Sequence, residues 1–89
     1  MMKEILREII DKPIEMVTLE ALMNCFEVIK DNGDIGLIKF DGLRESSHYT
    51  VVVTIPSLDN THIRMDDSSL KNAVIKVLVK YYKLKYDSN

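Results

Sequence analysis

The amino-acid sequence predicts an α+β fold, with a three-stranded antiparallel sheet packed with helices in the order α-α-β-β-β-α. Two observations support this prediction. Apolar residues recur with helical spacing in two stretches near the start of the chain and in one at its end, and between them the spacing changes to strand-like alternation. The chain has 89 residues, of which 46% are hydrophobic, which is enough for a single small domain, residues 1–89, with one core.

The last long run, residues 66–86, has the clearest helical pattern. With Asp67 or Ser68 as N-cap, its apolar residues have the spacing of an amphipathic helix. They are Leu70, Ala73, Val74, Val77, Leu78, Tyr81 and Leu84. A second apolar stripe consists of Ile75, Val79, Tyr82 and Tyr86. Two apolar faces need two partners, so we expect the first stripe to meet the sheet. The second would meet either another helix or a second copy of the chain, as a candidate homodimer interface.

Two shorter helices are predicted before the sheet. Residues 2–10 form an amphipathic helix that stops at Lys12-Pro13. The second helix follows Thr18 as N-cap and ends at Asp31-Asn32-Gly33, where Gly33 suits the left-handed conformation. The lone Cys25 lies at the edge of its apolar face, and we expect a small buried or half-buried hydrophobe in a reducing compartment.

Three strands are predicted at residues 35–40, 48–55 and 61–65, with a loop at 43–47 and a loose tail at 87–89. Residues opposite each other in an antiparallel pair share a face, so Ile63 must oppose Val53 or Ile55. We prefer Ile55, because that register leaves Leu58-Asp59-Asn60 as a three-residue loop. Pairing Ile63 with Val53 would leave a five-residue loop instead.

The outer face of the predicted sheet is polar and is the candidate binding surface. The candidate binding residues on or near it are Arg44, His48, Thr50, His62 and Arg64. Two histidines on one face suggest a metal, but His48 and His62 are separated by about 20 Å along the strands at about 3.3 Å per residue. They cannot share one ion within a protomer, so we expect no metal site.

The sequence contains no motif that points to catalysis, and we expect neither enzymatic activity nor a cofactor. It has no Gly-rich phosphate loop, no nucleophile elbow and no paired-cysteine site. The acids and serines of Asp66-Asp67-Ser68-Ser69 are typical of a helix start. A net charge of −2 gives no general attraction to phosphate or anionic lipid. Without a membrane-length apolar run or a signal-peptide pattern, we expect a cytoplasmic protein without membrane contact.

A basic stripe keeps a nucleic-acid partner open as the alternative. It consists of Lys76, Lys80 and Lys83, with Arg44, Arg64 and Lys85. A charged helix face is more often only solvated. The predicted layout resembles the double-stranded-RNA-binding arrangement, whose members carry a basic cluster at the start of the last helix. Here that position reads Ser68-Ser69-Leu70-Lys71 after two aspartates.

Two further resemblances concern families of small proteins. The run Tyr49-Thr50-Val51-Val52-Val53 with Ile55-Pro56 and a helix beginning near Ser69 resembles the core of HicB-type antitoxins over residues 48–82, without the glycine that usually precedes their helix. The segments TLEALMNCFEVIKDNG, HYTVVVTIP and SSLKNAVIKVLVKYY are similar to the phage ABA-sandwich domain family over residues 18–82.

The second resemblance implies a small accessory protein of a phage or prophage. We therefore expect a non-enzymatic binding protein that binds and inhibits or sequesters a host component, either a defence protein or a small signalling molecule. The alternatives are a nucleic-acid-binding regulator, with a double-stranded-RNA-binding-like or HicB-like layout, and a structural assembly factor.

Overall fold

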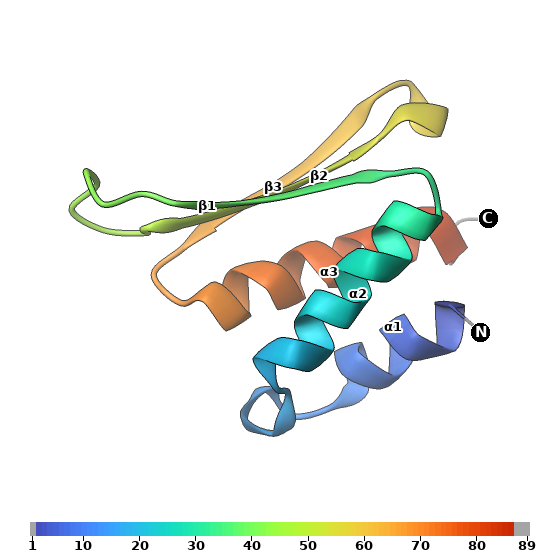
Figure 1. The fold of residues 1–89 in the computed structure, drawn as a ribbon, viewed down its shortest axis with the longest axis horizontal. Coiled ribbons are helices and arrows are strands. Elements are labelled where there is room, and N and C mark those ends of the chain that lie inside the picture. Colours follow the sequence, from blue (N-terminus) through green and yellow to red (C-terminus); the bar gives the residue numbers. More distant parts are fainter. Residues whose placement is uncertain (1, 87–89) are drawn as a thin grey trace.

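The computed structural model describes residues 2–86 and the side chains of residues 4–86; the expected loose tail at 87–89 lies outside this part. The elements are α1 (Met2–Asp11), α2 (Leu19–Asp31), β1 (Ile35–Phe40), β2 (Tyr49–Ile55), β3 (Thr61–Asp67) and α3 (Leu70–Tyr86). Two short 3₁₀ turns, η1 (Ile14–Met16) and η2 (Pro56–Leu58), lie between them. The predicted α+β fold and the order α-α-β-β-β-α are confirmed (Figure 1).

The antiparallel sheet forms one layer and the helices form the other. Its strand order is β1-β2-β3, so β2 is central and β1 and β3 are the two edges. All three helices lie on the same side of the sheet (Figure 1). The last helix, α3, packs against β2 and β3, whereas α2 packs against β1. The outer face of the sheet is therefore left uncovered by the described part of the chain.

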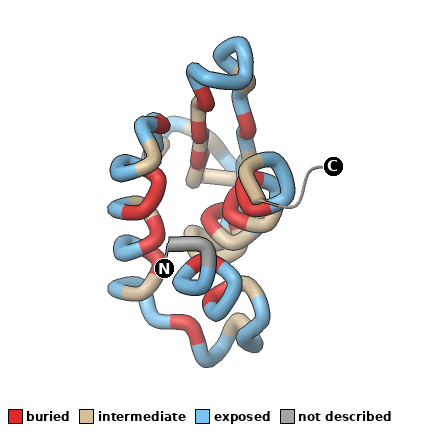
Figure 2. The backbone as a smooth tube through the Cα atoms, turned by 90° about the vertical axis from the view of Figure 1, so that its right-hand side faces the viewer, coloured by how far each residue is buried: buried red, intermediate tan, exposed pale blue. Residues whose placement is uncertain are grey.

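The core lies between these two layers (Figure 2). From the sheet it takes Val51, Val53 and Ile55 of β2, which are fully buried, as the predicted alternation requires. From the helices it takes mainly Leu22, Cys25 and Ile29 of α2 and Ala73, Val74, Val77, Leu78 and Tyr81 of α3. Thr18 caps α2 as predicted, because its Oγ1 accepts the Ala21 N–H at 3.1 Å.

The predicted register of the second hairpin is wrong, because the partner of Ile63 lies two residues from the predicted one. Ile63 opposes Val53, and Ile55 opposes Thr61. Both registers keep Ile63 on the inner face, so strand alternation does not choose between them. The turn decides: Pro56 begins the 3₁₀ turn η2 instead of extending β2, and both Asp59 and Asn60 are left-handed, with φ of 58° and 56°. The loop accordingly spans residues 56–60.

The start of α3 also differs from the prediction. β3 continues to Asp67, two residues beyond its predicted end, and the N-cap of α3 is Ser69 rather than Asp67 or Ser68. The Asn72 N–H donates to Ser69 Oγ at 3.3 Å. Asp67 instead accepts the Ser69 N–H at 2.9 Å and pairs with Lys76 at 2.9 Å.

The second apolar stripe of α3 finds a partner within the chain. α1 packs across α3 with Leu6 and Ile9 buried, and Tyr82 is only 7% exposed. The Arg7 guanidinium lies 5.5 Å from the centre of the Tyr82 ring. The other members of the stripe, Ile75, Val79 and Tyr86, are half-buried. The sequence left either another helix or a second copy of the chain as the partner of this stripe. In the structure the helix α1 packs against it.

Candidate functional site

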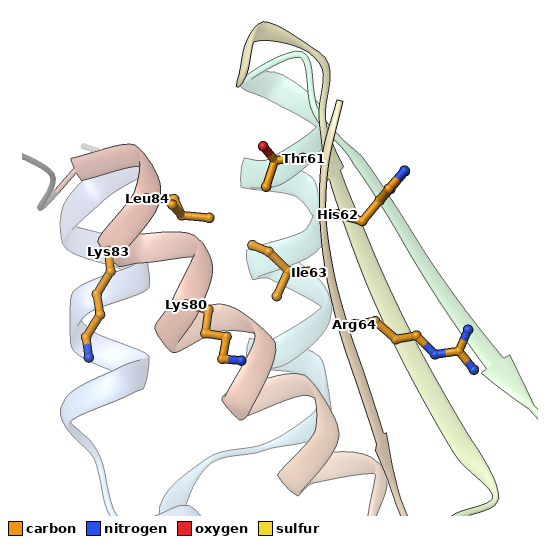
Figure 3. A pocket seen from close by; sticks show the side chains of 7 residues that line it. All are labelled: Thr61, His62, Ile63, Arg64, Lys80, Lys83 and Leu84. Atoms are coloured by element: carbon orange, nitrogen blue, oxygen red, sulfur yellow. The ribbon is translucent and has the colours of Figure 1, made fainter. Parts of the chain in front are cut away.

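A groove runs between the edge strand β3 and helix α3. It encloses a pocket of about 500 Å³, within the range of ordinary ligand sites. Its lining residues are Thr61, His62, Ile63 and Arg64 of β3 and Lys80, Lys83 and Leu84 of α3. Figure 3 shows that Thr61 and Ile63 point toward α3, whereas His62 and Arg64 project from the opposite face of the sheet. The groove therefore has an apolar floor and a polar rim.

The charge of the groove is positive. No acidic side chain is among its lining residues. In the described part of the chain, Lys80 and Lys83 make no hydrogen bond or ion pair, whereas every other described lysine and arginine does. Arg64 at the rim is compensated by Asp66, with an Nε–Oδ2 distance of 3.3 Å. The uncompensated charge thus comes from Lys80 and Lys83.

The floor of the groove is formed by Ile63 and Leu84. Ile63 is 5% exposed, so it belongs to the core as well as to the groove. Leu84 is 37% exposed, although the helical pattern predicted it as part of the core stripe. A partly exposed leucine beside unpaired lysines can accept an apolar group of a partner.

Two of the predicted binding residues, His62 and Arg64, lie at this groove. The Thr54 hydroxyl and His62 Nδ1 are 2.8 Å apart across the strands. His62 is exposed, and its Thr54 contact leaves the ring on the outer face of the sheet.

Arg44 and Thr50 belong to a different cluster, centred on Asp66. Arg44 Nη1 donates to Asp66 Oδ1 at 3.0 Å, and the Thr50 hydroxyl donates to the same oxygen. These hydrogen bonds, with that of Arg64, hold the pKa of the Asp66 carboxyl well below its usual range. Thr50 is only 4% exposed, so its side chain is not on the open surface. This cluster fastens the 41–48 loop to β3.

The structure keeps the two histidines apart, as the strand spacing predicted. His62 opposes Thr54 near one end of β2, while His48 precedes Tyr49 at the other end. Residues 2–86 contain no group of three or more His, Cys, Asp or Glu side chains that could hold a metal ion.

A buried polar network near the same C-terminal end of α3, formed with the residues that precede β1, was not singled out from the sequence. The Tyr81 hydroxyl donates to Asp34 Oδ2 at 2.6 Å, and Lys85 Nζ lies 3.1 Å from the same oxygen. The Asn32 side-chain amide donates to Tyr81 and Tyr86 at 2.9 and 2.7 Å. Burial and the neighbouring Asp34 raise the pKa of Tyr81. Every residue in this network has a hydrogen-bond or ion-pair partner, so the network stabilises the packing of α3 against the turn before β1.

Cys25 is fully buried, and burial raises the pKa of its thiol to about 11. A thiol in this state is protonated at neutral pH and is a poor nucleophile. The predicted role of Cys25 as a small buried hydrophobe agrees with this environment.

The groove residues Thr61, Ile63 and Leu84 were not predicted as site residues, and Lys80 and Lys83 were predicted only as part of the basic stripe of the nucleic-acid alternative. One sequence signal could have identified the lysines: α3 contains no aspartate or glutamate, so its lysines cannot pair along the helix. Lys76 finds Asp67 across the turn, but Lys80 and Lys83 lie farther along α3.

Comparisons with models of protein families, with curated proteins and with solved structures found no match. The resemblance to the phage ABA-sandwich domain family therefore stays a prediction. Within residues 2–86, none of the helices combines the length and the apolar character needed to cross a bilayer.

Proposed function

We propose that this chain is a small binding protein that works without catalysis and captures a negatively charged partner in the groove between β3 and α3. The observation that carries the proposal is the pair of unpaired lysines, Lys80 and Lys83, beside the partly exposed Leu84. Two uncompensated cations next to an apolar floor attract an anionic group and supply contact area for it.

The reactive side chains elsewhere in the chain support a role without catalysis. Cys25 is buried and protonated. Asp34 and Tyr81 are tied to each other and to Lys85. The Asp66 carboxylate is occupied by Thr50, Arg44 and Arg64. A general base or a nucleophile must reach a substrate, and these groups are held by their own neighbours.

We further propose that the protein is encoded by a phage or prophage and acts in the cytoplasm by binding and inhibiting or sequestering a host component, either a defence protein or a small signalling molecule. This part of the proposal rests on the resemblance over residues 18–82. A positively charged groove suits either target, because exposed acidic segments and phosphorylated small molecules both carry negative charge.

Site-specific photo-crosslinking in bacterial cells tests the proposed function. We place p-benzoylphenylalanine in place of Thr61, an uncharged residue that lines the groove, and in a control in place of Lys30, which lies on α2. We expect a discrete adduct from position 61 that is absent from position 30 and falls about tenfold when Lys83→Glu is added. The same adducts from both positions, or none from position 61, would overturn the proposal.

A nucleic-acid-binding regulator is the second candidate, favoured by the same two lysines. If Lys80 and Lys83 each neutralise one phosphate, the logarithm of the affinity for duplex nucleic acid should fall with the logarithm of salt concentration with a slope of about −2. Fluorescence anisotropy of a labelled duplex at several salt concentrations measures this slope. A duplex that does not bind at low salt removes this candidate.

We also propose that the protein assembles as a homodimer. The α3 stripe is covered by α1 along Tyr82, whereas Ile35, Leu37 and Phe40 of β1 are 58 to 68% exposed. An edge strand with exposed apolar side chains and open backbone groups is a typical contact between copies. In sedimentation at high protein concentration we expect Leu37→Lys to lower the average mass and Val79→Glu to leave it unchanged. The reverse result would place the contact between copies on α3. A wild-type protein that sediments as a monomer would overturn the homodimer proposal.

A further inference from the structure

The open edge of β3 offers backbone hydrogen-bonding groups directly above the groove. The Asp41 N–H donates to the His48 carbonyl at 2.8 Å, which identifies the odd-numbered residues of β1 as those bonded to β2. In antiparallel strands the direction of these groups alternates from residue to residue. The odd-numbered residues of β2 therefore bond to β3, and Ile63, opposite Val53, uses its backbone groups for that pairing. The N–H and C=O groups of His62 and Arg64 point to the open edge.

A strand added beside β3 would continue the sheet past that edge, with its inner face toward the open side of the groove. Its side chains would alternate between the outer face, next to His62 and Arg64, and the inner face, above Ile63 and Leu84. Lys80 and Lys83 of α3 both line the groove, and Lys80 extends from the side of α3 nearer to β3 (Figure 3). An apolar side chain directed inward would meet Ile63 and Leu84, and an inward carboxylate two residues away would be within reach of the lysines.

We propose that the partner enters this groove as an extended, acidic peptide segment that adds to β3 as an antiparallel fourth strand. The inference deepens the proposed function and rests on it. Backbone pairing along an open edge is a recurrent way of binding a peptide, with alternate side chains providing the specificity. The open backbone groups of His62 and Arg64 favour a peptide over a nucleic acid, because a phosphate chain does not complement an alternating row of donors and acceptors.

A designed peptide tests the strand addition. The probe is the end-capped, fluorescently labelled heptapeptide Thr-Glu-Thr-Val-Thr-Glu-Thr, which places both glutamates and the valine on the inner face when its threonines oppose His62 and Arg64. The threonine backbone groups then face β3, and the valine N–H faces solvent. In fluorescence anisotropy we expect N-methylation of the two central threonines to weaken binding at least about tenfold. N-methylation of the valine is the matched control and should leave binding nearly unchanged.

The charge requirement is tested by reversal. A peptide with lysines in place of both glutamates should bind the wild-type protein at least about tenfold more weakly. The double variant Lys80→Glu, Lys83→Glu should reverse this preference, and Lys30→Glu, on α2 beside β1, should not. Both lysines are exposed, and far-UV circular dichroism checks that the variants keep the fold.

Several results would overturn the inference. Equal loss from the two N-methylated peptides, or no loss from either, would exclude the stated strand pairing. A ten-nucleotide oligo-dT that binds more tightly than the acidic peptide and displaces it would identify a nucleic acid as the partner instead. If position 61 captures a partner in cells while no acidic peptide binds, the proposed function stands and the strand addition fails. If position 61 captures nothing, both fail.

Discussion

The two edges of the sheet differ in what lies beside them. Along β1, the side chains of Ile35, Leu37 and Phe40 are exposed, and α2 lies beneath the strand. Along β3, the open backbone groups belong to His62 and Arg64, and α3 forms a groove with the strand. An apolar edge attracts any other strand, including that of a second copy. A charged edge above a groove restricts what can bind, so we expect the β3 edge to be the more selective of the two.

The largest expected difference between the edges is in stability. Ile63 is 5% exposed and Leu37 is 59% exposed. We expect Ile63→Ala to lower the free energy of unfolding by about 2 to 4 kcal/mol, because it removes buried methyl groups and leaves a cavity. At protein concentrations where the chain is monomeric, Leu37→Ala should change it by no more than about 0.5 kcal/mol. Urea unfolding at such concentrations measures both, and equal losses would contradict the exposure of Leu37 in the single chain.

Gly36 tests how closely β1 approaches α2. A Cβ at this position would lie 2.7 Å from Phe26 Cδ2, so the phenyl ring would have to move. We expect Gly36→Ala to destabilise the protein by about 1 to 3 kcal/mol in thermal or urea unfolding. Gly42→Ala is the control, since nothing lies within 4 Å of its Cβ. Combining Gly36→Ala with Phe26→Leu should cost less than the sum of the two single changes, because the smaller side chain makes room.

Acid should loosen the β3 side of the sheet through Asp66. Hydrogen bonds from Thr50, Arg64 and Arg44 lower the pKa of this carboxyl in the folded state, whereas in the unfolded chain it is about 3.9. A carboxyl with a lowered folded-state pKa contributes stability above the unfolded pKa and loses it as the pH falls toward the folded value.

We therefore expect the midpoint of urea unfolding to fall between about pH 4 and pH 2 more steeply in the wild type than in Asp66→Asn. Asp59→Asn is the control, because the Asp59 carboxylate makes no hydrogen bond or ion pair within residues 4–86 and asparagine tolerates its left-handed backbone. Parallel acid profiles for the wild type and Asp66→Asn would contradict this assignment.

The smallest effect is local and concerns amide exchange along the two edges. At protein concentrations where the chain is monomeric, we expect fast hydrogen exchange at Gly36 and Ile38 of β1 and at His62 and Arg64 of β3, whose N–H groups point away from β2. The alternate amides of Leu37 and Ile63 should exchange more slowly, because they are hydrogen-bonded within the sheet. NMR-detected exchange measures each site. If the acidic heptapeptide binds as proposed, it should slow His62 and Arg64 and leave Gly36 and Ile38 unchanged.

The elements of this fold are predictable from the sequence because their signals are local. Apolar spacing identifies the three helices and the three strands and assigns Val51, Val53 and Ile55 to the inner face. It leaves the register of the second hairpin open, since shifting by two residues keeps every side chain on its face. The turn geometry at Pro56 and the left-handed Asp59 and Asn60 decide it.

The candidate site was harder to predict because it depends on relations between elements. His62 and Arg64 were predicted as outer-face residues, and they line the edge of the groove while their side chains project to the outer face. Lys80 and Lys83 looked like an ordinary solvated helix face, and only the placement of α3 beside β3 shows that they share a groove and have no described partner. The second stripe of α3 had two possible partners in the sequence, and the packing of α1 supplies one of them.

The fastening of Asp34 to Tyr81 has a consequence for the order in which the molecule assembles. These residues are 47 positions apart, whereas β2 and β3 are joined by the loop at residues 56–60. Closing the longer loop costs about 2 kcal/mol more chain entropy. We therefore expect the β2–β3 hairpin to form before the end of α3 docks on the turn that precedes β1. Contacts made after the rate-limiting step govern the rate of unfolding. Loss of the Asp34–Tyr81 hydrogen bond would then increase the rate of unfolding and leave the rate of folding nearly unchanged.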